Sequence, residues 1–190
     1  MTRNAAPPRE VRIIGGQWKR TKLPVPDKPG LRPTPDRVRE TLFNWLGQDL
    51  SGWRCIDVFA GTGALGFEAA SRGASDVLLV EQDPDLVSLL RATQSRLEAK
   101  AVKVQRGNGL SALASAAPGS FDLVFLDPPF DASLWDKALA AAAPALTADG
   151  VIYLEASARW DETSAAALGL VIDRHMKAGA VHAHLLRRAA

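Results

Sequence analysis

Residues 57–66 read DVFAGTGALG, directly after the apolar pair Cys55-Ile56. Gly61, Gly63 and Gly66 complete the pattern G-x-G-x-x-G, which is typical of a tight turn between a buried strand and a helix. Glycine is needed there because the chain turns sharply and a ligand has to approach the backbone closely. The stretch therefore predicts the first strand, turn and helix of a ligand-binding α/β sheet.

Apolar runs and amphipathic segments alternate through the rest of the chain. Such alternation produces a doubly wound, Rossmann-like parallel sheet with helices on both faces, joined by right-handed crossovers. We expect strands at residues 55–59, 77–80, 102–104, 123–126, 151–154, 168–172 and 181–186, and helices at 64–72, 84–99, 110–116 and 134–143.

The residues before this alternation predict a short extension. We expect residues 1–9 to be disordered, because they are short, polar and contain proline. Residues 10–33 form a basic N-terminal hairpin and a proline-rich linker in this interpretation, with a glycine turn in the hairpin. The main domain then covers residues 34–190, and its first helix is expected to begin with Thr34 as N-cap and Pro35 in the first turn.

Length and composition indicate a single globular domain. The chain has 190 residues, of which 47% are hydrophobic and 23% charged. Its one cysteine, Cys55, cannot form an internal disulfide, so a reducing compartment fits best. We recognise neither a signal peptide nor an apolar run long enough for a membrane span. A cytoplasmic protein without membrane contact is expected, and we expect it to be a monomer.

Charge is distributed unevenly along the chain. The net charge is only +2, but residues 1–40 contain ten basic and four acidic residues. A basic leading segment is typical of contact with a polyanion such as RNA, although a solvated terminus has the same composition.

The histidines lack the neighbours that a metal site needs, so we predict no metal and interpret them as surface or edge residues.

Acidic residues near the glycine turn favour S-adenosyl-L-methionine as the cofactor. Asp57 precedes the first glycine by four residues, where it would repel a pyrophosphate but attract an ammonium group. Glu81 ends the next strand and can accept hydrogen bonds from ribose hydroxyls. Asn108 either contacts the adenine edge or is simply a turn residue. The residues assigned to the cofactor site are Asp57, Phe59, Gly61, Thr62, Gly63, Glu81, Gln82, Asn108 and Gly109.

The segment Asp127-Pro128-Pro129-Phe130 follows another apolar run and is more specific. Two prolines remove two backbone donors and restrict φ, so the strand ends in rigid acceptors. Asp127 and the Pro128 carbonyl would each accept one N–H of an amino group on a planar base, and Phe130 would stack on that base. The segment predicts methyl transfer to a nucleobase nitrogen; the alternative is a proline turn with Phe130 in the core.

Four segments together resemble the bacterial RsmD family: residues 12–16, 31–46, 57–66 and 127–130. The family consists of 16S ribosomal RNA guanine-N2 methyltransferases with a class I fold, a seven-stranded, mostly parallel sheet and a small N-terminal hairpin. The resemblance implies methyl transfer from S-adenosyl-L-methionine, leaving S-adenosyl-L-homocysteine, to N2 of one guanine in the small ribosomal subunit or its assembly intermediate. It also implies that Arg12, Arg37 and Arg39 contact RNA phosphates or line the pocket, with ordinary surface charge as the alternative, and it implies catalytic roles for Asp127, Pro128 and Phe130. Pro35, where related chains often have Thr, and a final strand without aromatic residues depart from the pattern.

Other functions share parts of these motifs. A DNA adenine-N6 methyltransferase uses a similar acidic-Pro-Pro-aromatic segment, but it normally needs a larger target-recognition region. A nicotinamide-dependent oxidoreductase shares the glycine turn, yet the chain has no Tyr-x-x-x-Lys pair. A non-catalytic RNA-binding assembly factor with the same fold also stays open.

Overall fold

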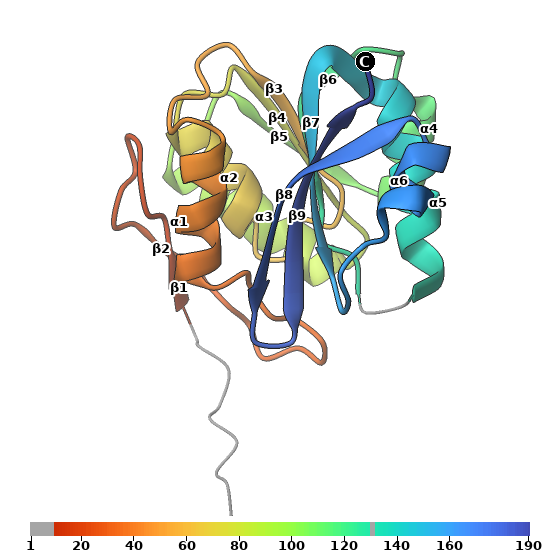
Figure 1. Cartoon of the computed structure of the whole chain (residues 1–190). Helices are drawn as coiled ribbons and strands as arrows, with labels where there is room; N and C mark the ends of the chain where they lie inside the picture. The colour runs from red at the N-terminus through yellow and green to blue at the C-terminus, as the bar shows by residue number, and fades with distance from the viewer. Residues whose placement is uncertain (1–9, 130–131) are drawn as a thin grey trace, which may run out of the picture.

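The structure, a computed structural model, describes residues 10–129 and 132–190. The expected disorder of residues 1–9 and the expected role of Phe130 therefore lie outside the described residues. Within them, an α/β domain surrounds one seven-stranded sheet, and a two-stranded hairpin lies at its side (Figure 1). This architecture confirms the fold that the sequence predicted.

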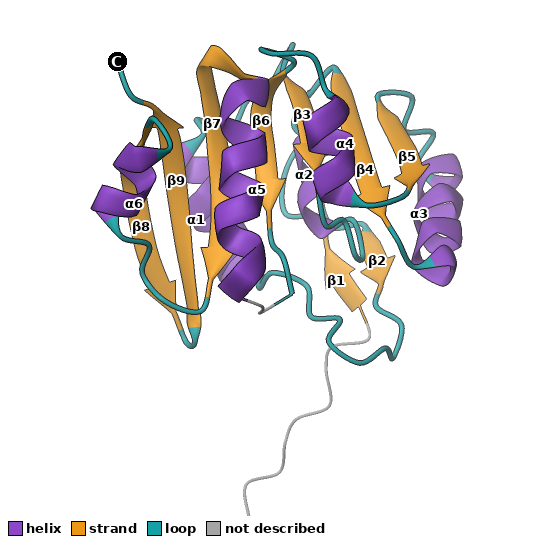
Figure 2. Ribbon diagram, turned by 90° about the vertical axis from the view of Figure 1, so that its right-hand side faces the viewer, coloured by secondary structure: helices purple, strands orange, loops and turns teal. Residues whose placement is uncertain are grey.

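The sheet has the strand order β5-β4-β3-β6-β7-β9-β8. Strands β3 to β7 are parallel to one another, and β9 runs antiparallel between β7 and β8, so the sheet is mostly parallel (Figure 2). The strands are β3 (Arg54–Asp57), β4 (Asp76–Glu81), β5 (Val102–Arg106), β6 (Phe121–Leu126), β7 (Leu146–Ala156), β8 (Leu170–Ala178) and β9 (Val181–Arg188).

Helices cover both faces of the sheet. In Figure 1, α1, α2 and α3 lie on one side and α4, α5 and α6 on the other. Each face has its own apolar core, because strands buried on both sides carry side chains toward both helical layers. The helices are α1 (Asp36–Trp45), α2 (Ala64–Ser71), α3 (Pro84–Arg96), α4 (Gly109–Ser115), α5 (Ala132–Ala145) and α6 (Glu162–Ala167).

Local sequence signals explain several helix starts. Asp83 caps α3, since its side chain accepts the backbone N–H groups of Asp85 and Leu86, and Pro84 occupies the first turn as expected. Asn108 caps α4 through its side-chain oxygen, at 3.0 Å from Ser111 N. Gly63 precedes α2 with φ of 79°, a conformation that favours glycine.

Four elements differ most from the expectation. α1 begins at Asp36, and Thr34 does not cap it, because the Thr34 hydroxyl donates to Glu155 instead. β7 and β8 are both longer than predicted, and they end at Ala156 and Ala178. The short helix α6 was not predicted, since only six residues, mostly small, form it.

The N-terminal hairpin packs against α2 rather than extending into solvent. β1 (Glu10–Arg12) pairs with β2 (Lys22–Pro24), which confirms the predicted hairpin. A Cβ added to Gly16 would lie 1.8 Å from the Ser71 carbonyl oxygen, and Gln17 N donates to the same oxygen. The turn therefore covers the C-terminal end of α2, where carbonyl groups need donors.

A buried carboxylate joins the hairpin to the domain. Glu68 of α2 is fully buried and accepts the backbone N–H groups of Ile14 and Gly15 at 2.9 and 2.8 Å. It also pairs with Arg39 at 3.2 Å and with Arg72 at 3.0 Å. The guanidinium of Arg39 binds Asp36 as well as the carbonyl groups of Thr34 and Arg12. Hairpin, α1 and α2 thus meet in one hydrogen-bonded ion network.

We predict that Arg39→Met destabilises the protein by about 3–5 kcal/mol, because removing one partner of a buried ion pair leaves the other charge undercompensated. The free energy of unfolding in urea measures this loss. Arg12→Met is the matched control: Arg12 pairs with Asp36 at the surface, where ion pairs contribute little. Equal losses in both variants would contradict the importance of the buried network.

Candidate functional site

Four acidic side chains gather where the central parallel strands end. Asp57 ends β3, Glu81 ends β4, Asp127 follows β6, and Glu155 lies next to the end of β7. These strands are neighbours in the sheet, so their carboxyl ends share one edge. In open α/β sheets this edge holds the ligand crevice.

The glycine turn provides close backbone approach at this edge. Gly61 has φ of 54° and donates its N–H to Glu81 at 2.9 Å. A Cβ on Gly63 would come within 2.6 Å of Phe67 and 2.7 Å of Leu90, and one on Gly66 within 2.1 Å of Leu79. Larger residues at these positions would therefore clash with side chains packed between α2, α3 and the sheet.

Asp57 is buried beneath this turn. Its Oδ2 accepts the Gly66 N–H at 3.1 Å, whereas its Oδ1 has no hydrogen-bond partner among the described residues. Burial, the main cause, raises the pKa of Asp57 to about 7, and the carboxylates of Glu81 and Glu155 add to this effect. An unpartnered buried carboxylate oxygen is suited to a cationic group of a ligand.

Glu81 is held by three backbone donors. In addition to Gly61 N, its carboxylate accepts Gln82 N at 2.8 Å and Asp83 N at 2.9 Å. These contacts orient the half-buried carboxylate at the end of β4, and a carboxylate has about four acceptor positions. Glu81 can therefore accept a further hydrogen bond from a hydroxyl group.

The other residues assigned to the cofactor site surround the same edge. Phe59 is half-buried, Thr62 is buried and Gln82 is exposed. Asn108 is exposed and its oxygen caps α4, which agrees with the turn interpretation of this residue. A Cβ on Gly109 would lie 2.0 Å from the Val58 carbonyl oxygen, so glycine is required where α4 starts against the end of β3.

Asp127 and the two prolines end β6 beside Asp57. β6 pairs with β3, and Asp57 lies opposite Phe125 in the register. Part of Asp127 is exposed, but its carboxyl group is desolvated: burial raises its pKa well above the ordinary value, and the charges of Glu155 and Asp57 raise it further. Pro128 is buried and Pro129 exposed.

Glu155, Tyr153 and Thr34 also belong to this site, although the sequence analysis did not assign them to it. Glu155 Oε1 accepts the hydroxyl groups of Thr34 at 2.6 Å and Tyr153 at 2.8 Å. An acidic residue that directly follows the apolar run Val151–Leu154 was the available signal, because it repeats the placement of Glu81.

The three arginines expected to bind RNA lie in different environments. Arg12 and Arg37 are exposed. Arg39 has no exposed surface, and its guanidinium is bonded to Glu68, Asp36 and two carbonyl groups. This burial corrects the interpretation of Arg39 as an RNA contact, since the side chain joins elements inside the protein.

The histidines require a second correction. His184 is fully buried, and its Nε2 accepts Trp160 N at 2.9 Å, so it is not a surface residue. Burial lowers the pKa of His184 to about 4.

Residues 10–129 and 132–190 contain no group of three or more side chains arranged to hold a metal ion. In those same residues, no helix has both the length and the apolar character to cross a membrane.

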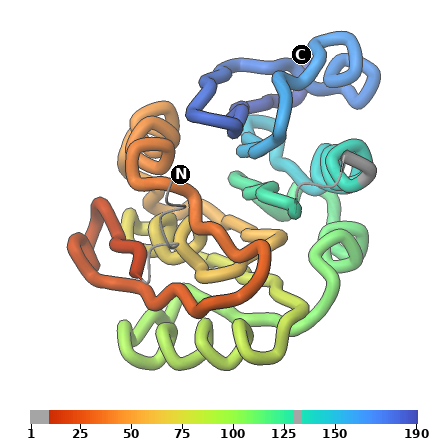
Figure 3. Tube along the Cα trace, turned by 90° about the horizontal axis from the view of Figure 1, so that it is seen from below, coloured from red at the N-terminus to blue at the C-terminus, as the bar shows by residue number. Residues whose placement is uncertain are grey.

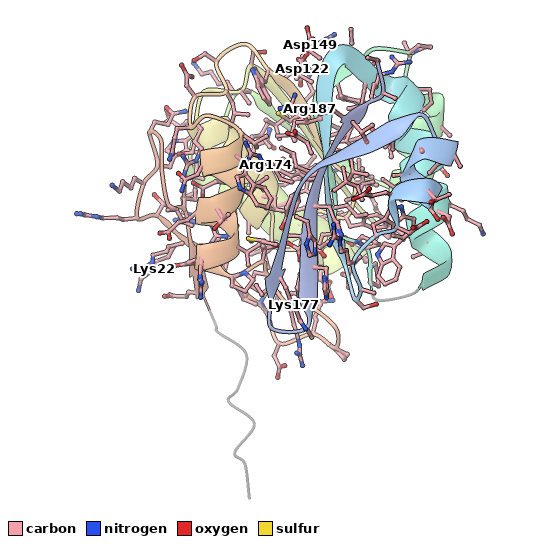
Figure 4. All side chains as sticks on the ribbon, viewed as in Figure 1. Lys22, Asp122, Asp149, Arg174, Lys177 and Arg187 are labelled. Atoms are coloured by element: carbon pink, nitrogen blue, oxygen red, sulfur yellow. The ribbon has the colours of Figure 1, made fainter. Side chains whose placement is uncertain are left out.

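Charged side chains of both signs lie at each edge of the sheet. Figure 4 shows Lys22 and Lys177 toward the edge where β3 to β7 end, and Asp122, Asp149 and Arg187 toward the opposite edge. Figure 3, viewed from the first edge, shows the hairpin and linker (red and orange) running along it. Lys28 of the linker pairs with Asp83 at 2.7 Å and Asp85 at 2.9 Å, which fastens the linker next to Glu81.

Comparison with known proteins identifies the family. The profile of the family described as Conserved hypothetical protein 95 matches residues 11–187. Ribosomal RNA small subunit methyltransferase D of Escherichia coli K12 is 48% identical over 130 residues, which cover 68% of this chain. The chain belongs to the RsmD family. The aligned segment spans 65% of the length of this relative.

Solved structures agree with this membership of the RsmD family. The proposed methyltransferase yhhF of Escherichia coli superimposes with a TM-score of 0.81 and 39% identity, covering 95% of this chain and 99% of the other. Precorrin-6y C5,15-methyltransferase of Geobacter metallireducens has a TM-score of 0.66 at 17% identity and covers 87% and 94%, a likeness of fold alone. The chain has a class I methyltransferase fold.

We predict that Asp57→Asn stabilises the protein more at pH 8 than at pH 5. Because the folded-state pKa of Asp57 is raised to about 7, folding holds its proton, and stability falls as pH rises from the unfolded-state pKa through 7. The amide removes this loss, so the variant should gain up to a few kcal/mol above pH 7 and progressively less below it. Urea unfolding of both proteins from pH 5 to 8 measures the difference; a gain independent of pH would contradict the assignment.

Proposed function

We propose that this protein transfers a methyl group from S-adenosyl-L-methionine to the exocyclic N2 of a guanine in 16S ribosomal RNA of the small subunit. The observation that carries the proposal is the donor-free tip Asp127-Pro128-Pro129, which lies beside the glycine turn at the same edge of the sheet. The names of the relatives, ribosomal RNA small subunit methyltransferases, support the RNA substrate.

The residues around the glycine turn fit the cofactor. The unpartnered Oδ1 of Asp57 suits the ammonium of its methionine part, and Glu81 suits the ribose hydroxyls. Gly61 and Gly63 leave room for the backbone to approach it. When bound, the cofactor supplies an electrophilic methyl group on a sulfonium.

Asp127 and Pro128 would hold the target amine. The amino nitrogen of guanine donates its electron pair to the ring and is a weak nucleophile. If the Asp127 carboxyl and the Pro128 carbonyl each accept one N–H, the lone pair is directed out of the ring plane. Positive charge that develops on the nitrogen then faces preorganised acceptors, which is the form of stabilisation that usually dominates catalysis.

Exposed basic residues near the site suit an RNA substrate. Arg12 and Arg37 are exposed beside the start of α1, and Thr34, just before that helix, is bonded to Glu155 at the site. Phosphates bound there would lie close to Asp127. The cofactor, the target base and the RNA backbone would thus approach the protein from one side.

Methylation of small ribosomal subunits tests the function. Small subunits from cells that lack the gene are incubated with the protein and S-adenosyl-L-methionine labelled in its methyl group. We expect label in N2-methylguanine at one position of 16S RNA. Label in N6-methyladenine of added DNA would overturn the RNA assignment, and tight RNA binding with no label would favour a non-catalytic assembly factor.

We predict that Asp127→Ala lowers the rate of methyl transfer at least a hundredfold, because it removes the side-chain acceptor that the target amine needs. Cofactor affinity, measured by calorimetry, should be nearly unchanged. Asp122→Ala at the other end of β6 is the matched control and should keep the wild-type rate. Substantial turnover by the Asp127 variant would refute this mechanism.

We predict that the double variant Arg12→Gln, Arg37→Gln weakens RNA binding and lowers the slope of log affinity against log salt by about 0.7–0.9 for each lost phosphate contact. Binding of a 16S RNA fragment at several salt concentrations measures the slope. Arg54→Gln with Lys103→Gln, which removes two exposed basic residues paired with Asp122 and Asp76, is the control. An unchanged slope in the first double variant would place the RNA elsewhere.

A further inference from the structure

A second buried carboxyl group lies behind Asp127. Glu155 is 4% exposed and projects from the end of β7, the strand next to β6. Its Oε1 accepts two hydroxyl hydrogen bonds, from Thr34 at 2.6 Å and from Tyr153 at 2.8 Å. These donors come from different elements and restrict the rotation of the Glu155 side chain.

Leu126 of β6 lies opposite Leu154 of β7, so Asp127 and Glu155 are neighbours, and their carboxyl groups lie within hydrogen-bonding reach of each other. Two carboxyl groups can form a hydrogen bond only if one of them carries a proton, since ionised carboxylates only accept. The hydroxyl donors on Glu155 stabilise its charged form, so the proton resides mainly on Asp127. One oxygen of the Asp127 carboxyl group therefore contacts Glu155 in the protein interior.

We propose that Glu155 is a positioning residue for Asp127: its hydrogen bond holds one oxygen of the Asp127 carboxyl inward and leaves the other facing the crevice. The inference rests on the proposed function, in which Asp127 accepts an N–H of the target amine. A rotated carboxyl would direct the amine away from the methyl donor, and misplacement by about 1 Å can cost roughly a hundredfold in rate.

Thr34 extends this arrangement to the N-terminal extension. It lies 121 positions before Glu155, between the basic linker and α1, yet its hydroxyl reaches the same carboxylate oxygen as Tyr153. Arg39 holds the Thr34 carbonyl at 3.0 Å, so the buried ion network also fixes this donor. The extension therefore contributes directly to the orientation of Asp127.

The titration of Asp127 reports on this pair without any assay of activity. The titratable groups that face the pair are Asp57 from β3 and Tyr153 from β7. The charge of Glu155 raises the pKa of Asp127, so removing that charge should lower it. The Thr34 hydroxyl lowers the pKa of Glu155 by donating a hydrogen bond to its charged form. Without this hydroxyl, a second negative charge on the Asp127–Glu155 pair is less favourable. The second proton should then leave the pair at a higher pH.

The experiment combines carboxyl NMR with kinetics on the full chain. Aspartate labelled with ¹³C at Cγ is incorporated, and Asp127→Asn identifies the Asp127 signal. In Glu155→Gln we expect the upper titration step of Asp127 to move down by about one pH unit or more. With RNA substrate, kcat should fall roughly tenfold to a hundredfold while KM for the cofactor stays unchanged.

Thr34 variants test the same arrangement without altering a carboxyl group. Thr34→Val keeps the shape of the side chain but lacks the hydroxyl, so it should move the Asp127 titration to higher pH and lower kcat. Thr34→Ser keeps the hydroxyl and should leave both at their wild-type values. Glu162→Gln on the exposed surface of α6 is the control and should change neither. A purely structural role would lower stability without moving the titration.

An Asp127 titration that is the same in Glu155→Gln and in the wild type overturns the proposal, as does equal behaviour of Thr34→Val and Thr34→Ser. Failure of the proposed function is distinguishable from failure of this inference. If the wild-type protein methylated no RNA, the function would be refuted, while the NMR titrations would still decide whether Glu155 controls the Asp127 carboxyl.

Discussion

Burial of the Glu68 carboxylate is the constraint on which the arrangement of this protein depends. An ionised group without solvent must be surrounded by donors, and here the donors come from the hairpin turn, from α1 and from α2 itself. Each of these elements is thereby fixed relative to the others. Because Arg39 also binds the Thr34 carbonyl, the same network determines where the linker enters the main domain, close to the end of β7.

The candidate site shows a different use of buried acidic groups. Asp57, Asp127 and Glu155 are desolvated and lie close enough to raise one another's pKa or to share a proton. Such crowding lowers stability, and perturbed carboxyl groups in a crevice are typical of functional sites. Glu68 is instead compensated by two guanidinium groups, so this buried acid joins elements, whereas Asp57, Asp127 and Glu155 lie at the ligand edge.

Much of this could be predicted from local sequence. The expected helix at residues 84–99 starts where α3 starts, at Pro84, and the apolar runs marked the strands, because helix starts and periodicity depend on neighbouring residues. Thr34 and Arg39 were interpreted incorrectly for one common reason. A threonine before a helix normally caps it, and an arginine in a basic segment normally faces solvent, but here distant carboxylates, Glu155 and Glu68, bind them.

The sequence alone determined the order of strands and helices, the glycine turn and the acidic residues at strand ends, since these follow from the backbone requirements of short segments. Only the tertiary structure decided which acids share an edge, that Arg39 is enclosed, and that Thr34 reaches Glu155. The physical reason is that hydrogen bonds between residues far apart in the chain depend on how the sheet and its helices pack, and no pattern within a local window contains that information.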